Sequence, residues 1–143
     1  GEGRKEALFP EAFYPPVVTP MDGLVMVKMH TRSKRVYVSF CSADQRQVKQ
    51  VAVVEMEKPV LNASAVGYDA RGHLYLFVVL GRFDDNYESA WVLELDKTGK
   101  ALRRVQVPES PGIGMNRYLG VTPDSRILKV EADEKTFRIV EYR

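Results

Sequence analysis

Cysteine and histidine are scarce in this chain. Its 143 residues include one cysteine, Cys41, and two histidines, His30 and His73. One cysteine cannot form an internal disulfide, and one thiol with two imidazoles offers no zinc-binding spacing. The sequence therefore predicts a fold held together by its apolar core, and its cysteine content indicates no particular redox compartment.

Long uncharged stretches and a large excess of charge of one sign are also missing. The longest uncharged stretches, such as 12–21 and 73–81, are much shorter than the roughly 18–20 apolar residues that span a bilayer. Lys and Arg number 21 against 19 Asp and Glu, whereas a nucleic-acid-binding domain usually carries a clear basic excess on one face. We therefore expect no membrane insertion and no nucleic-acid partner.

The chain does contain enough apolar material for one folded domain. Hydrophobic residues make up 45% of it and aromatic residues 10%, which is ample for a core at this length. No segment shows sustained helical periodicity, and apolar strand-like runs recur between turn residues. We predict a single all-β domain over 1–143. The first residue is Gly1 rather than Met, which is typical of a trimmed start, so localisation cannot be read directly from the sequence.

Three segments of the chain resemble one another. The run at 67–78 reads GYDARGHLYLFV, and the run at 120–131, 53 residues later, reads GVTPDSRILKVE. An earlier run at 19–27, TPMDGLVMV, matches 122–130 at an offset of 103 residues. Each run is typical of a strand, a tight turn and a second strand. A period of about fifty residues is that of a propeller blade or a similar array.

Further strands are predicted after each copy. Third strands are expected at 36–40, 91–95 and 137–142, and fourth strands at 48–54 and 101–107. The pattern predicts antiparallel meanders in three units, about 16–57, 62–108 and 116–143. The strands expected at 74–80, 91–95 and 36–41 are apolar on both parities, so both faces of the sheets that contain them should be covered. The mixed pattern of 102–107 predicts an outer strand that meets water.

The run GYDARGHLYL from Gly67, with Trp91–Leu95 and the turn DKTGKAL from Asp96, resembles a blade of the NHL-type six-bladed β-propellers. The resemblance covers about one unit and fits the first and third copies loosely. It implies a β-propeller-like domain of three four-stranded antiparallel blades, half of a six-bladed ring. Bacterial propellers of this kind are often exported, so the resemblance also points to an extracytoplasmic location. It decides no function, since such propellers include hydrolases, lactonases, ligand sensors and interaction scaffolds.

Three blades do not close a ring, because closed propellers usually have about four to eight. The third unit lacks an outer strand, and residues 5–9 have no other assigned place, so they are a candidate closing strand. We hypothesise a homodimer in which two three-bladed halves form one six-bladed ring. The aromatic, proline-rich segment with Phe9, Phe13 and Tyr14 would be its exchanged arm, or would pack on a sheet edge. The alternatives are a piece of a longer propeller and a three-sheet β fold of another kind.

Two loops carry candidate binding residues. The inserted loop at 82–89 offers a cluster of oxygen ligands for a possible calcium ion, namely Asp84, Asp85, Asn86 and Glu88. Calcium takes six to eight oxygens, but the spacing matches no calcium-loop signature, which favours an ordinary solvated loop. The loop at 30–35 contains His30, Arg32 and Arg35 and is expected on the same face of the stacked blades as the loop at 82–89. It is a candidate anion site or an ordinary charged hairpin turn.

Motifs for nucleophilic catalysis are missing. There is no Gly-x-Ser-x-Gly elbow, and Cys41 falls inside a predicted strand, where a free cysteine usually behaves as a small buried apolar residue. His73 is expected to pack or to be exposed rather than to act as a ligand. The propeller resemblance implies that a hydrolase of this kind would hold a metal through acidic and amide side chains at inner-strand ends, and only Asn62 and Asn116 lie near those positions.

The sequence thus favours a non-catalytic binding or assembly module, with no required cofactor and with itself or another protein as partner. The alternative is a metal-assisted, lactonase-like hydrolase with its site at a central channel.

Overall fold

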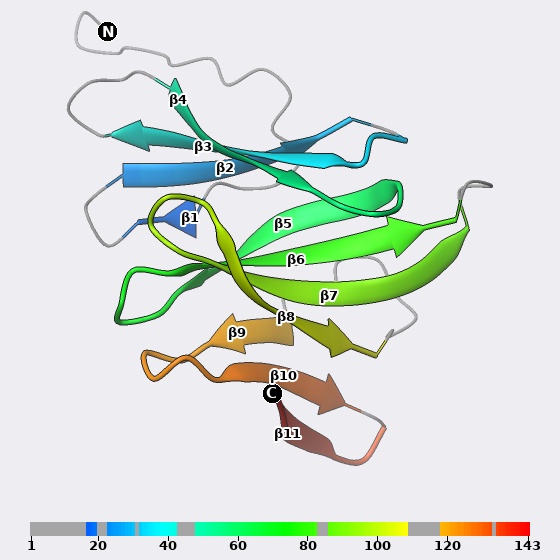
Figure 1. The fold of residues 1–143 in the computed structure, drawn as a ribbon. Coiled ribbons are helices and arrows are strands. Elements are labelled where there is room, and N and C mark those ends of the chain that lie inside the picture. Colours follow the sequence, from blue (N-terminus) through cyan, green and yellow to red (C-terminus); the bar gives the residue numbers. More distant parts are fainter. Residues whose placement is uncertain are drawn as a thin grey trace, which may run out of the picture.

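The computed structural model describes residues 17–19, 23–30, 32–42, 48–82, 86–108, 118–132 and 134–143. These residues form three antiparallel β-sheets (Figure 1), so the all-β prediction is confirmed. Sheet 1 contains β1 (Val17–Val18), β2 (Gly23–Met29), β3 (Arg35–Ser42) and β4 (Val48–Glu55). Sheet 2 contains β5 (Val60–Tyr68), β6 (Leu74–Gly81), β7 (Tyr87–Leu95) and β8 (Ala101–Val107). Sheet 3 contains β9 (Leu119–Val121), β10 (Ile127–Ala132) and β11 (Phe137–Tyr142).

Every sheet is a meander in which consecutive strands are neighbours. Sheets 1 and 2 have four strands each, as predicted, and sheet 3 has three. The third unit has no outer strand of its own among the described residues, as predicted: β11 reaches Tyr142 and no described strand pairs with its outer edge. The predicted closing strand at 5–9 lies outside the described residues.

One type of turn joins the first two strands of each sheet. In each copy the first turn residue donates its backbone N–H to the carbonyl four residues later, and its side-chain oxygen accepts the N–H of that residue. The pairs are Thr19 with Gly23, Asp69 with His73 and Thr122 with Arg126, with donor-to-acceptor distances of 2.8–3.2 Å. Two of the turns also share a left-handed residue, Gly72 (φ 76°) and Ser125 (φ 71°). The sequence repeat is therefore a repeat of backbone geometry.

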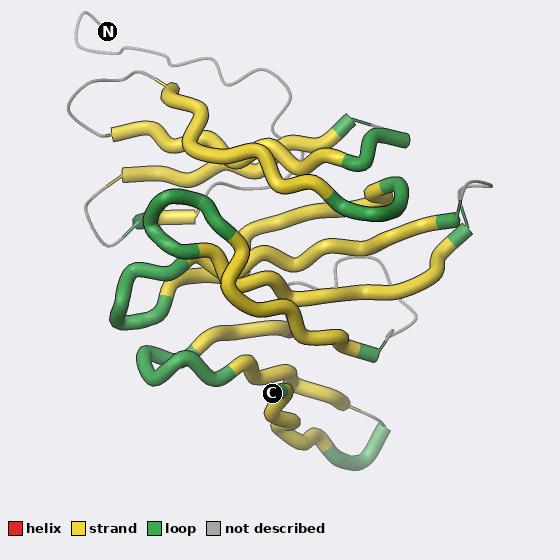
Figure 2. The backbone as a smooth tube through the Cα atoms, viewed as in Figure 1, coloured by secondary structure: helices red, strands yellow, loops and turns green. Residues whose placement is uncertain are grey.

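The three sheets are stacked face to face, as the tube in Figure 2 makes clear. One core lies between sheets 1 and 2 and includes Val38 and Leu76; a second lies between sheets 2 and 3 and includes Phe77 and Ile127. Strands β6 and β7 are consequently buried on both faces, which confirms the prediction from their two apolar parities. Strand β8 alternates between exposed and buried residues, as expected for an outer strand.

The first strands of the three sheets gather on one side of the stack. Strands β1 and β2 lie against β5, and β5 lies against β9. Cys41 is buried in β3 as a free cysteine, in agreement with its predicted role as a small apolar residue. In the described part of the chain, no helix has the length and apolar character needed to cross a membrane.

Candidate functional site

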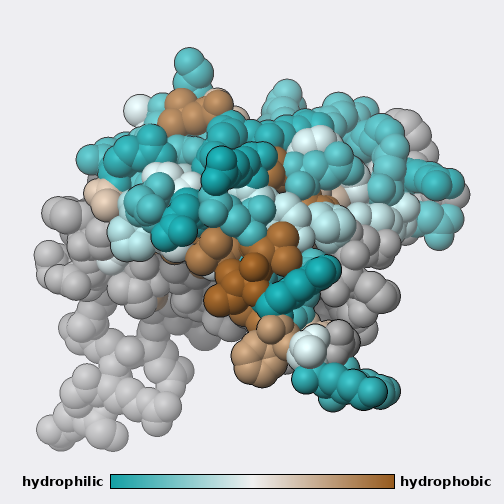
Figure 3. All heavy atoms as spheres, turned by 90° about the horizontal axis from the view of Figure 1, so that it is seen from below, coloured by the Kyte–Doolittle hydropathy of each residue, from teal (hydrophilic) through white to brown (hydrophobic). Residues whose placement is uncertain are grey.

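The outer face of sheet 3, directed away from sheet 2, is apolar and uncovered by any described residue. Cross-strand pairs place Val130 opposite Ile139 and Ala132 opposite Phe137. The side chains of Phe137, Ile139 and Val130 are 81%, 68% and 42% exposed. Figure 3, which views the molecule from below, shows apolar atoms gathered between hydrophilic ones on this side. We refer to Val130, Ala132, Phe137 and Ile139 as the outer patch.

The inner face of the same strands is buried against sheet 2. Ile127 and Lys129 are at most 5% exposed because they pack toward sheet 2. The inner face of sheet 3, which also carries charged residues, thus has a described neighbour, whereas the apolar outer face has none among the described residues. Contiguous exposed apolar surface is uncommon on folded proteins. Strand β11 also has an unpaired outer edge within the described part of the chain, and an open edge is a template for a further strand.

A polar network joins sheets 2 and 3 at the repeated turns. The Asp69 carboxylate, fully buried, accepts the backbone N–H groups of Arg71 and His73 at 2.9 and 3.0 Å. Its other oxygen accepts the Arg71 guanidinium at 2.7 Å, the Ser125 hydroxyl at 2.8 Å and the Tyr75 hydroxyl at 3.2 Å. Ser125 belongs to sheet 3's turn, so this carboxylate fixes one sheet to the next.

Glu94 on β7 is the second carboxylate of the network. Its Oε1 accepts Arg71 Nη2 at 2.6 Å and lies 2.8 Å from His73 Nδ1, and its Oε2 accepts Arg103 Nε at 3.0 Å. Arg103 also donates to the backbone carbonyl of Ser125 at 3.1 Å. Two carboxylates and two guanidiniums therefore meet between the sheets, and their charges cancel.

The network favours the ionised form of both carboxylates. Burial opposes ionisation of Asp69, but the His73 backbone N–H and the Arg71 guanidinium outweigh it and hold the pKa of Asp69 well below its usual range. Burial likewise opposes ionisation of Glu94, while His73 and Arg71 lower its pKa. Both groups consequently remain charged at neutral pH.

Asp69, His73 and Glu94 bring three possible metal-ligand atoms within 4.8 Å of one another. The residues around them do not fit a cation. Arg71 Nη2 lies 2.7 Å from Asp69 and 2.6 Å from Glu94, so a permanent positive charge already bridges the two carboxylates. Arg103 supplies a second such charge. The arrangement acts as a clamp between sheets 2 and 3 rather than as a metal centre.

Two residues of the predicted anion loop have partners of their own. His30 makes an edge-on contact with Tyr37, at 5.8 Å between ring centroids. Arg35 forms an ion pair with Glu55 at 3.0 Å. Arg32 is exposed and has a left-handed backbone, with φ 64°. These contacts do not test anion binding, so the anion site and the charged hairpin turn both stay predictions for this loop.

The predicted metal residues are only partly described. Asp84, Asp85 and Asn116 lie outside the described residues, and Asn86 is exposed. Glu88 pairs with Lys58 through one oxygen, while its Oε2 is buried without a hydrogen-bond partner. The Oδ1 of Asn62 is also buried and without a partner.

Sequence reasoning missed the network of Asp69, His73 and Glu94. It expected His73 to pack or to be exposed, whereas the structure pairs its ring with Glu94 on β7. The available signal was a buried-strand glutamate in the run WVLEL, preceded by a turn containing Asp, Arg and His.

No family model, no curated protein and no solved structure matches the chain.

Proposed function

We propose that this chain is a non-catalytic assembly module of propeller type, which associates with a second copy of itself. The observation that carries the proposal is the outer patch, where Phe137 and Ile139 stand exposed on a sheet whose other face is packed. Burying apolar surface is the main driving force of most protein association. Three stacked meanders with their first strands on one side support the propeller part of the proposal, since propeller blades also gather their first strands around one axis.

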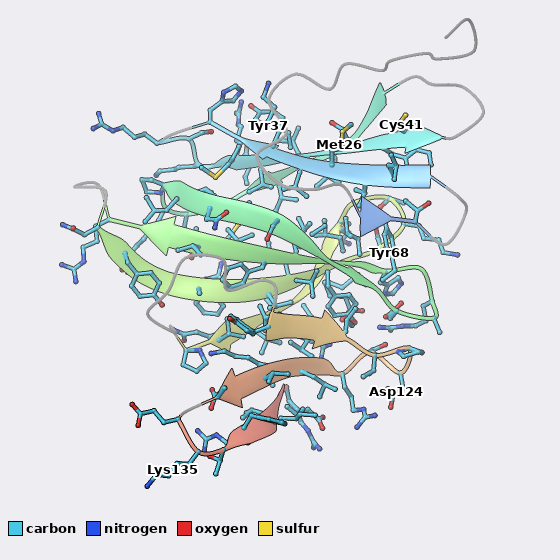
Figure 4. The ribbon with its side chains drawn as sticks, turned by 180° about the vertical axis from the view of Figure 1, so that it is seen from behind. Met26, Tyr37, Cys41, Tyr68, Asp124 and Lys135 are labelled. Atoms are coloured by element: carbon cyan, nitrogen blue, oxygen red, sulfur yellow. The ribbon has the colours of Figure 1, made fainter. Side chains whose placement is uncertain are left out.

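A two-fold arrangement would use both ends of the stack. By the alternation of β2, β3 and β4, the face of sheet 1 directed away from sheet 2 carries Leu24, Tyr37 and Val53, while Met26 on the same face is 8% exposed. Met26, Tyr37 and Cys41 are marked on this sheet in Figure 4, and Val53 is exposed. Sheet 3 of each copy would then cover sheet 1 of the other, and the two-fold axis would repeat the contact. Six sheets would complete the ring.

The proposal is tested by changing the outer patch without disturbing the core. Phe137→Ser removes the most exposed apolar side chain, and Leu102→Ser is the matched control because Leu102 is half-exposed on β8, away from the patch. Loss of a central interface aromatic costs at least about 2 kcal/mol, which is roughly thirtyfold in Kd. Light scattering after size exclusion should show monomers for F137S and dimers for L102S. Equal masses for both variants would contradict the proposal.

The hydrolase alternative stays a prediction with its own test. A calcium-dependent site would stabilise the fold by binding the native state only, so a thermal scan with calcium and then with a chelator should show a shift. We do not favour it, because the one cluster of three possible ligands in the described part of the chain is already neutralised by Arg71 and Arg103.

A further inference from the structure

A cleft of about 690 Å³ opens between sheets 1 and 2, at the end that carries the repeated turns. Its lining is apolar: the core residues Val25 and Val38 of sheet 1 and Leu74 and Leu95 of sheet 2 are at most 6% exposed at its inner end, and the partly exposed Phe40 also lines it. The volume lies in the range of small-molecule sites, which are mostly apolar with a few polar groups.

The cleft is apolar because sheet 1 lacks the polar residues that sheet 2 carries at the equivalent positions. Gly23 closes the turn of sheet 1 as His73 closes the turn of sheet 2. Strand pairing sets Leu24 opposite Cys41 in sheet 1 and the equivalent Leu74 opposite Leu95 in sheet 2. The residues that precede Cys41 and Leu95 are therefore also equivalent. Phe40 thus occupies in sheet 1 the position that Glu94 occupies in sheet 2. Sheet 1 therefore lacks the imidazole and the carboxylate of the network described above. Where that network fills the gap between sheets 2 and 3, an apolar space remains between sheets 1 and 2.

Two polar groups border this space without partners among the described residues. Tyr68 packs against the core between sheets 1 and 2, beside β1 in Figure 4; burial raises its pKa, so its hydroxyl is a proton donor at neutral pH. The side chain of Lys97 lies over Gly72, with Nζ 3.9 Å from the place of a Cβ there.

The other charged residues of the cleft are already engaged. Asp69 and Arg71 belong to the network, and one oxygen of Asp96 accepts three hydrogen bonds within its own turn, from Thr98 and Lys100. Lys97 is consequently the cation at the cleft that is available to a ligand.

We propose that this cleft binds a small amphiphilic carboxylate, with its apolar body between sheets 1 and 2 and its acid group at Lys97 and Tyr68. The apolar walls favour a hydrocarbon or aromatic body by removing it from water. The ammonium and the phenol hydroxyl supply a charge-assisted and a neutral hydrogen bond to the acid group. The inference goes beyond the assembly role and does not rest on it.

The test uses decanoate below its micellar concentration and decanol as the uncharged comparison, in calorimetric titrations of the chain. The background is F137S, whose outer patch is less apolar and so offers less unspecific binding. We expect one saturable decanoate site and weaker binding of decanol. Lys97→Gln should weaken decanoate binding about tenfold and leave decanol unchanged, while Lys100→Gln, on the same turn but outside the cleft, should change neither.

A second variant tests the location. Ala70 is exposed at the mouth of the cleft, so Ala70→Trp should obstruct entry without disturbing the core, and it should weaken binding of decanoate and decanol alike. The absence of a saturable site, or binding that both Lys97→Gln and Ala70→Trp leave unchanged, would overturn the inference. Because F137S is the background, these results are independent of whether the chain self-associates.

Discussion

The clamp between sheets 2 and 3 predicts a large, pH-dependent cost for Asp69→Asn. The substitution keeps the size of the side chain and the oxygen that accepts the turn N–H groups. It replaces the other oxygen by an amide NH₂, which faces the Arg71 guanidinium at 2.7 Å. One charge-assisted hydrogen bond contributes about 1.5–3 kcal/mol, and breaking a buried ion pair costs about 3–5 kcal/mol. The Ser125 and Tyr75 hydroxyls can rotate to accept, so we expect a loss of about 3 kcal/mol.

The assay is urea or thermal unfolding followed by circular dichroism. For a domain of this length the expected loss is roughly 10 °C in Tm. The control is Asp124→Asn, because Asp124 is an exposed carboxylate of the equivalent turn in sheet 3; its midpoint should stay near that of the unchanged chain.

The pH dependence of this loss follows from the lowered pKa of Asp69. Between the folded and unfolded pKa values the unfolded chain binds more protons, so the stabilisation from Asp69 is complete above about pH 5 and declines as pH falls toward 2. The difference between the unchanged chain and D69N should shrink over the same interval. A loss below about 0.5 kcal/mol at pH 7, or a loss that is constant down to pH 3, would refute the clamp.

Three further outcomes are expected. Gly72→Ala should destabilise the fold by about 1–2 kcal/mol in urea unfolding, since Gly72 has φ 76° and an added Cβ would lie 3.1 Å from Lys97; Gly120→Ala, with nothing within 4 Å, should have little effect. Glu94→Gln should destabilise the fold by about 2 kcal/mol at pH 7 through weaker bonds from Arg71 and Arg103, and the loss should decline below about pH 4.5 because the pKa of Glu94 is lowered. Arg104→Ala should lower stability by about 1 kcal/mol and shift the Trp91 fluorescence, because the guanidinium lies 4.0 Å above that ring.

The repeats and the strand positions could be predicted from sequence because they depend on local chemistry. The turn residues at 69–73 and 122–126 recur at a fixed offset, and the same hydrogen bonds form in both. The apolar runs of β6 and β7 required cover on two faces, which the structure supplies. The third strand at 137–142 was likewise predicted, whereas the uncovered outer face of sheet 3 was not and became visible only in the structure.

The polar network and the cleft could not be predicted, because both depend on cross-strand register and on the gap between sheets. His73 and Glu94 are 21 residues apart in sequence, and only the β6–β7 pairing brings them together. The difference between an ionic network beside Glu94 and an apolar cleft beside Phe40 likewise depends on which side chains face each other across the stack. The loop candidates at 30–35 were chosen for their charge alone. Exposed charged side chains in a hairpin turn cost the fold little free energy without a ligand, so their charge alone does not indicate a binding site.

Sedimentation equilibrium of the unchanged chain over a dilution series tests the assembly proposal most directly. The proposal predicts a mass of twice 16.2 kDa at high concentration, falling toward the single-chain mass only on strong dilution. A mass of 16.2 kDa at every concentration would contradict association through the outer patch.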